Sequence, residues 1–271
     1  MPPQRRPNFF LMTYIDSHCH LNSPELESLM PDELDACSAA NVRGAVIVGT
    51  TLDDSRQAIS LCRRWGGRMA LKATAGVHPH ETSALPDGWT DQLKELLGQP
   101  ETAALGEIGL DYHYNLSPRD RQLDALRLQL RLAGETKKPV VFHVREAYGD
   151  FWAVTDSEPT PCGAVLHCFD GTSADAAAGL ERGWFIGVTG AVTFASRDEL
   201  RETLGGVPLE SLLVETDCPY MAPVPFRGKT NRPSWVPLVY SKLAGVKNVS
   251  VGELAEAVRA NAARLFGLEV L

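Results

Sequence analysis

One alternation, repeated along nearly the whole chain, constrains the fold more than any other feature. A short run of β-branched or apolar residues is followed by a segment with helical spacing, and the pair recurs at roughly 30-residue intervals. The expected strands are 14–20, 44–49, 71–76, 102–108, 139–143, 164–167, 184–188 and 212–216. The expected helices are 32–41, 53–65, 90–97, 118–136, 146–154, 173–182, 196–204 and 251–266. The sequence therefore predicts an α/β fold with a parallel sheet.

Eight strand-helix units favour a TIM-like (β/α)8 barrel, with an open doubly wound sheet as the alternative. The length of 271 residues suits a single barrel. We expect one hydrolase-type barrel domain over residues 12–271. Residues 1–11, "MPPQRRPNFFL", have no periodic pattern. We interpret them either as a disordered arm or as an over-extended start before Met12.

Charge and hydropathy exclude some classes of protein. The net charge of −8 argues against a protein that holds nucleic acid by its overall field, although it leaves room for a local cationic site. No apolar run approaches the roughly 18 residues of a membrane span, and "FFLM" is too short for a signal-peptide core. We expect a cytoplasmic protein with no membrane association and no obligate protein partner.

The six cysteines have no C-x-x-C spacing, so neither a zinc ribbon nor a redox motif is indicated. Cys19, Cys168 and Cys218 each directly follow a residue of the candidate site described below. Because neighbours on a strand point to opposite faces, we expect these thiols to face away from the site and to pack as small hydrophobic groups.

Metal-competent side chains collect where the expected strands end, which in a barrel is the mouth formed by the βα loops. They are His18, His20, Glu107, His143, His167 and Asp217. Each alone has an ordinary explanation as a satisfied core histidine or as half of an ion pair. Buried imidazoles and carboxylates are costly unless they are paired or coordinate a cation, and six at one rim favour a metal site.

The stretch "YIDSHCHLN" places Asp16, His18 and His20 at period two. Residues at this spacing share one face of a strand, which in a barrel is the lumen. Two imidazoles on that face can converge on one cation. We expect Asp16, which lies deeper, to orient one of the histidines by hydrogen bonding.

Four imidazoles and two carboxylates exceed the needs of one tetrahedral ion with an open position, so we predict two ions. The natural partition gives His18, His20 and Asp217 to one ion, gives His143 and His167 to the other, and makes Glu107 the bridge. Two divalent ions about 4 Å apart stabilise the attacking and leaving oxygens of a phosphoryl displacement and acidify water. Hydrolysis is the reaction class that this pattern indicates.

Six ordered motifs cover nearly the whole chain: "DSHCHLN", "GVHPHE", "GEIGLDY", "FHVREA", "LHCFDG" and "ETDCPYMAPVPFRGK". Together they resemble the TatD family of metal-dependent deoxyribonucleases, in the amidohydrolase superfamily. The resemblance implies a TIM-like barrel that hydrolyses DNA phosphodiesters with divalent metal. The family's metal positions fall on the same six residues, and Asp217 takes the further role of the base that deprotonates or orients the attacking water.

The resemblance also suggests residues that contact substrate. His78 matches a family histidine near the site, and we expect it to contact phosphate. Arg145 and the loop with Arg227 and Lys229 supply cations for phosphate oxygens, although a solvated loop is the alternative for that basic run. His80 and His113 are interpreted as loop surface. Relatives often carry an acidic residue where this chain has Arg232; if that loop touches substrate, the local field is more positive here.

Two other functions stay open. The same barrel and metals would also suit hydrolysis of a small ester, lactone, amide or aminoacyl ester. Many carbonyl-hydrolysing relatives place a lysine where Glu107 stands, which favours the nuclease. The second alternative is a non-catalytic barrel with structural metal. The expected cofactors are two divalent ions per subunit, Zn²⁺, Mg²⁺ or Mn²⁺, and the expected substrate is DNA, gripped at an end or as a short single strand.

Overall fold

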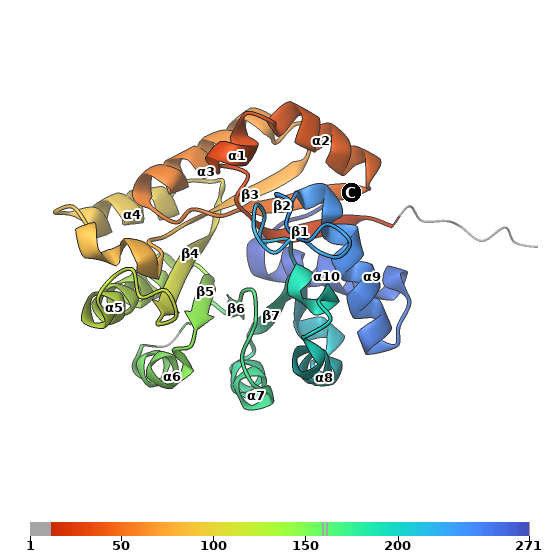
Figure 1. Ribbon diagram of the computed structural model, residues 1–271. Coiled ribbons are helices and arrows are strands. Elements are labelled where there is room, and N and C mark those ends of the chain that lie inside the picture. Colours follow the sequence, from red (N-terminus) through yellow and green to blue (C-terminus); the bar gives the residue numbers. More distant parts are fainter. Residues whose placement is uncertain (1–11, 159, 161, 271) are drawn as a thin grey trace, which may run out of the picture.

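The computed structural model describes residues 12–158, 160 and 162–270. Eight parallel strands in this part of the chain form one sheet in sequence order, and helices surround it (Figure 1). The strands are β1 Tyr14–Cys19, β2 Val42–Ile47, β3 Ala70–Ala75, β4 Thr102–Asp111, β5 Val140–Arg145, β6 Ala164–Leu166, β7 Phe185–Val188 and β8 Leu212–Val214. The predicted TIM-like barrel is confirmed, and residues 1–11 lie outside the described residues.

The helices alternate with the strands as predicted, with additions near both ends of the chain. They are α1 Pro24–Glu27, α2 Met30–Ala39, α3 Leu52–Trp65, α4 Trp89–Leu97, α5 Arg119–Thr136, α6 Tyr148–Ser157, α7 Ser173–Glu181, α8 Asp198–Gly206, α9 Val236–Lys247 and α10 Val251–Phe266. Short 3-10 helices are η1 Pro79–Ala84, η2 Gly190–Thr193, η3 Leu209–Ser211 and η4 Pro233–Trp235. Helices α1 and α9 have no counterpart among the helices predicted from the sequence.

Local sequence explains where several helices begin. Thr172 and Asp175 form a reciprocal capping box at the start of α7, and Ser250 and Glu253 form another at α10. At α3 the side chain of Thr51 accepts a hydrogen bond from the backbone N–H of Asp54. These caps satisfy backbone donors that have no partner inside the helix.

The seam between β8 and β1 closes by bonds outside the regular ladder. The Asp217 N–H donates to the His18 carbonyl at 2.9 Å, and the His20 N–H donates to the Cys218 carbonyl at 2.8 Å. The side chain of Tyr240 on α9 supplies further hydrogen bonds to β1. Its hydroxyl accepts one from the Ile15 N–H and donates one to the Ile15 carbonyl. The segments that carry the first and last candidate ligands are therefore held side by side.

Strand β4 runs to Asp111, three residues beyond the predicted end at Ile108. Gly109, paired with His143 of β5, allows this extension because it has a φ of +149° and lies against the neighbouring backbone. A Cβ at this position would meet the His143 carbonyl oxygen at 1.8 Å. The extension carries Asp111 to the mouth beside His143.

Candidate metal centre

The mouth of the barrel holds a cleft of about 810 Å³. All six predicted metal-binding residues meet at its base, and five of them line it. His18 is the exception because it is completely buried beneath the others. None of these residues lies away from the cluster, so the structure brings together the set that the strand-end argument selected.

A first group joins β1, β4 and the segment after β8. His18 Nε2 lies 3.3 Å from His20 Nε2, 3.4 Å from Glu107 Oε2 and 3.7 Å from Asp217 Oδ1. His20 Nε2 lies 3.4 Å from Asp217 Oδ1 and 3.8 Å from Glu107 Oε2. Four donors bonded tetrahedrally at about 2.1 Å to one ion stand roughly 3.4 Å apart. The donor types and their spacing thus fit a divalent cation.

A second group faces the other oxygen of the same carboxylate. Glu107 Oε1 lies 2.8 Å from His167 Nε2, 2.9 Å from His143 Nδ1 and 3.6 Å from His78 Nε2. Glu107 therefore presents one oxygen to each group of histidines.

The charges of the cluster depend on burial and on mutual contact. Burial alone would raise the pKa of Glu107, but His167, His78 and His18 lower it well below its usual value. Burial opposes ionisation of Asp217 as well, and the hydrogen bond from His20 lowers its pKa. Both carboxylates are thus ionised and available to a cation.

The histidines divide into two kinds. Burial lowers the pKa of His18 and His78 below the usual histidine value. Burial acts in the same direction at the other three, but carboxylates outweigh it: Glu107 raises the pKa of His167 well above its usual value, and neighbouring carboxylates also raise those of His20 and His143.

Two further carboxylates, which were not predicted from the sequence, contact the ring nitrogens of the histidines. Glu215, on the segment after β8, has Oε1 3.3 Å from His167 Nδ1 and accepts a hydrogen bond from the Cys168 N–H at 2.6 Å. Asp111 Oδ2 lies 2.9 Å from His143 Nε2 and 2.9 Å from His80 Nε2. Such partners fix the orientation of a ligating imidazole.

This arrangement corrects two expectations. Asp16 reaches His18 through the backbone and not through the imidazole ring, because its Oδ1 accepts a hydrogen bond from the His18 N–H at 3.4 Å. Its carboxylate also accepts hydrogen bonds from the Thr216 N–H at 2.8 Å and from the Thr216 hydroxyl, and so closes the β8–β1 seam. His80 is half-buried against Asp111 and lines the cleft, so its interpretation as loop surface was wrong. His113, in contrast, is exposed and pairs with Glu146.

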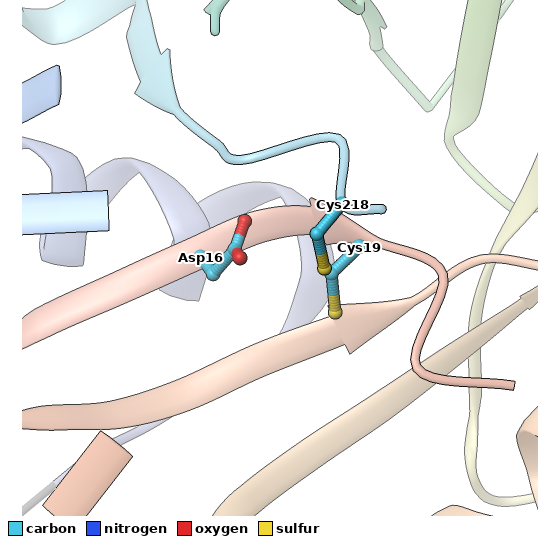
Figure 2. A group of neighbouring side chains, drawn as sticks. All are labelled: Asp16, Cys19 and Cys218. Atoms are coloured by element: carbon cyan, nitrogen blue, oxygen red, sulfur yellow. The ribbon is translucent and has the colours of Figure 1, made fainter. Parts of the chain in front are cut away.

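The thiols behave in two ways. Figure 2 shows Asp16 and Cys19 on β1 with Cys218 of the neighbouring segment, and their polar atoms lie within 4.8 Å of one another. Cys19 is fully buried and its thiol donates to the Val46 carbonyl; burial raises its pKa, so it stays a protonated packing group. Cys168 instead lines the cleft, which contradicts the expectation that it faces away.

Cationic side chains surround the cleft. Arg145, at the end of β5, lies over the Tyr114 ring, and Arg227 lies 3.9 Å from the centre of the Phe194 ring. Both line the cleft, whereas Lys229 does not. Arg232 points elsewhere, because its guanidinium lies 2.9 Å from the buried carboxylate of Glu33. The hypothesis that Arg232 makes the field at the substrate more positive is therefore not supported, because Arg232 pairs with Glu33.

Residues 15–267 match the family model described as TatD related DNase. The chain belongs to the TatD family. Its TatD relatives include the "uncharacterized metal-dependent hydrolase YcfH" of Escherichia coli K12, 38% identical over 95% of this chain and 97% of that protein. The "3'-5' ssDNA/RNA exonuclease TatD" of Cronobacter turicensis is 37% identical over 93% of this chain and 97% of its own.

Solved TatD structures agree with the fold. The crystal structure of YjjV, a TatD homolog from Escherichia coli K12, superposes with a TM-score of 0.88 at 29% identity and covers 94% of this chain and 98% of its own. The chain is thus a metal-dependent hydrolase of the TatD family. None of the helices in the described part of the chain has the length and hydropathy of a membrane span.

Proposed function

We propose that this TatD protein is an exonuclease that hydrolyses phosphodiester bonds of DNA, at an end or in a short single strand, with two divalent cations. The observation that carries the proposal is the position of the Glu107 carboxylate, whose two oxygens face two different sets of histidines. A relative named as a single-stranded DNA/RNA exonuclease matches almost the full chain, which supports the substrate class.

The proposed ligands follow from the two groups. His18, His20 and Asp217 would hold one ion, His143 and His167 the other, and Glu107 both. His78 Nε2, at 3.6 Å from Glu107 Oε1, is close enough to add a ligand or to contact a phosphate oxygen. Bound Zn²⁺, Mg²⁺ or Mn²⁺ would supply Lewis-acid polarisation of the phosphate and acidification of water.

Asp217 is assigned as the general base. Its Oδ1 faces His18 and His20, which leaves Oδ2 to accept the proton of the attacking water. Its ionised state suits this role, because a base must be unprotonated before it acts. Arg145 and Arg227 are assigned to the non-bridging oxygens and neighbouring phosphates of the substrate.

The decisive experiment compares substrates on the same enzyme. The protein is stripped with a chelator and then given Mg²⁺, Mn²⁺ or Zn²⁺, and hydrolysis of end-labelled single-stranded and duplex DNA is followed beside a small ester and a lactone. We expect nucleotides to be released one at a time from the single strand only after metal is restored.

A matched control separates site chemistry from contamination. Asp217→Asn keeps the shape of the side chain but removes its basicity, and it should lower the rate by at least about 100-fold. Faster hydrolysis of the ester or lactone than of any DNA would contradict the proposal and favour the carbonyl hydrolase. Hydrolysis that survives complete chelation would contradict the role of metal.

A further inference from the structure

Exposed apolar side chains gather at the mouth of the cleft. Among residues 12–158, 160 and 162–270, the large hydrophobic side chains that are exposed are Met12, Tyr114, Leu116, Leu128, Tyr220 and Val224. Tyr114, Leu116 and Tyr220 line the cleft, and Val224 lies between the cleft-lining residues Met221 and Arg227. Exposed apolar groups concentrated at one place indicate a binding surface, because scattered ones are normal on any protein.

The two tyrosines follow strands on opposite sides of the barrel. Tyr114 follows β4 and Tyr220 follows β8, and strands four apart in an eight-stranded barrel face each other across the lumen. Tyr114 and Tyr220 are 55% and 63% exposed, respectively, so both residues are accessible to a partner in the cleft. A ligand that crosses the mouth through the metal centre would meet both rings.

Both tyrosines are held in place on the protein side. The guanidinium of Arg145 lies 4.7 Å from the centre of the Tyr114 ring, and the rings of His113 and His80 lie roughly perpendicular to it, with ring centres 4.8 Å and 5.6 Å away. The Tyr220 N–H donates to the Asp217 carbonyl at 2.9 Å, and its ring stands edge-on to His20. Contacts of this kind reduce the entropy that the rings lose when a planar partner stacks on them.

We infer that Tyr114 and Tyr220 are stacking platforms for unpaired bases on the two sides of the scissile phosphate. This inference rests on the proposed function and specifies its substrate as a single-stranded polynucleotide. In a duplex the faces of the bases are covered by their neighbours, whereas a single strand can splay its bases onto aromatic rings. Arg145 beside Tyr114 places a cation where the adjacent phosphate of a stacked nucleotide would lie.

The first test needs only the unaltered, metal-loaded protein. Its hydrolysis of a single-stranded oligonucleotide is compared with that of an abasic strand with the same number of phosphates. We expect KM to rise roughly 25-fold or more for the abasic strand, from the loss of two stacking contacts, with little change in kcat. Equal KM values would overturn the inference while leaving the nuclease intact. Failure to cleave either strand would overturn the proposed function itself, and a lower KM for duplex than for single strand would overturn the choice of substrate.

The second test locates the effect. Tyr114→Ala and Tyr220→Ala should each raise KM for the base-bearing strand by roughly five- to 100-fold and leave KM for the abasic strand unchanged. Tyr114→Trp and Tyr220→Trp should restore binding, because they retain an aromatic face. Leu128→Ala removes an exposed apolar side chain from α5 away from the cleft and is the matched control. Equal KM increases for both strands, or no rescue by tryptophan, would overturn the inference.

Discussion

Glu215 lies beside His167 of the candidate metal centre but does not belong to the proposed ligand set. Its carboxylate is almost completely buried and lies 3.3 Å from His167 Nδ1, while His167 Nε2 faces Glu107 on the other side of the ring. One imidazole is therefore held between two carboxylates. An orienting carboxylate behind a ligating histidine fixes the ring and raises its basicity.

We predict that Glu215→Gln weakens metal binding by about 10- to 100-fold, because the neutral amide holds His167 less firmly and withdraws negative charge from it. Competition with a fluorescent chelator measures the affinity directly, without reference to turnover. Glu210→Gln, which neutralises an exposed carboxylate shortly before β8, is the control and should have no effect. Unchanged affinity in Glu215→Gln would show that His167 needs no such support.

Glu215 also shows which site residues can be predicted from the sequence. Alternate residues of a strand share one face, and this spacing correctly predicted that His18 and His20 point into the lumen. The same spacing, counted back two residues from Asp217, would also have selected Glu215. It could not find the Thr216 partner of Asp16, because Thr216 lies 200 residues away in sequence. His80 was missed because its partner Asp111 lies beyond the predicted end of β4.

At the scale of elements, an ion pair joins α2 to the segment that precedes η4. Glu33 of α2 is 1% exposed, and the guanidinium of Arg232 lies 2.9 Å from its Oε1. Burial raises the pKa of Glu33, and Arg232 opposes that shift. The pair therefore compensates a buried carboxylate, which would be costly without a partner.

We predict that Arg232→Ala lowers the free energy of unfolding by about 1–2 kcal/mol, less than for a fully buried pair because Arg232 is partly exposed. Denaturant titration of the metal-free protein measures the change. Adding Glu33→Gln should recover part of the loss, since no charge is then left unpaired. If the loss of stability in the double variant equals the sum of the losses in the two single variants, this coupling is contradicted. If Arg232→Ala lowers activity without changing stability, Arg232 acts at the substrate site instead.

At the scale of the whole molecule, the periodic pattern predicted the barrel because each strand-helix unit is local in sequence. The closure of the barrel could not be predicted in the same way. It depends on contacts between the first strand and the last quarter of the chain, such as those of Tyr240 with Ile15. The rim tyrosines escaped notice for a similar reason, because their opposition across the mouth appears only once β4 and β8 are placed.

The ring of histidines drawn from around the barrel predicts opposite effects of pH on the metal-free and metal-loaded protein. His20, His143 and His167 have raised pKa values, so the stability from their protonated forms is present at low pH and is lost as pH rises through those values. Metal must displace the same protons, so its affinity increases over the same range, above the usual histidine pKa of about 6.5. The increase in Tm caused by added metal should therefore grow between about pH 6 and pH 8. Thermal denaturation with and without chelator measures it, and the exposed His113→Gln variant is the control. A metal-induced shift that is constant or shrinks over this range would mean that these histidines do not bind the metal.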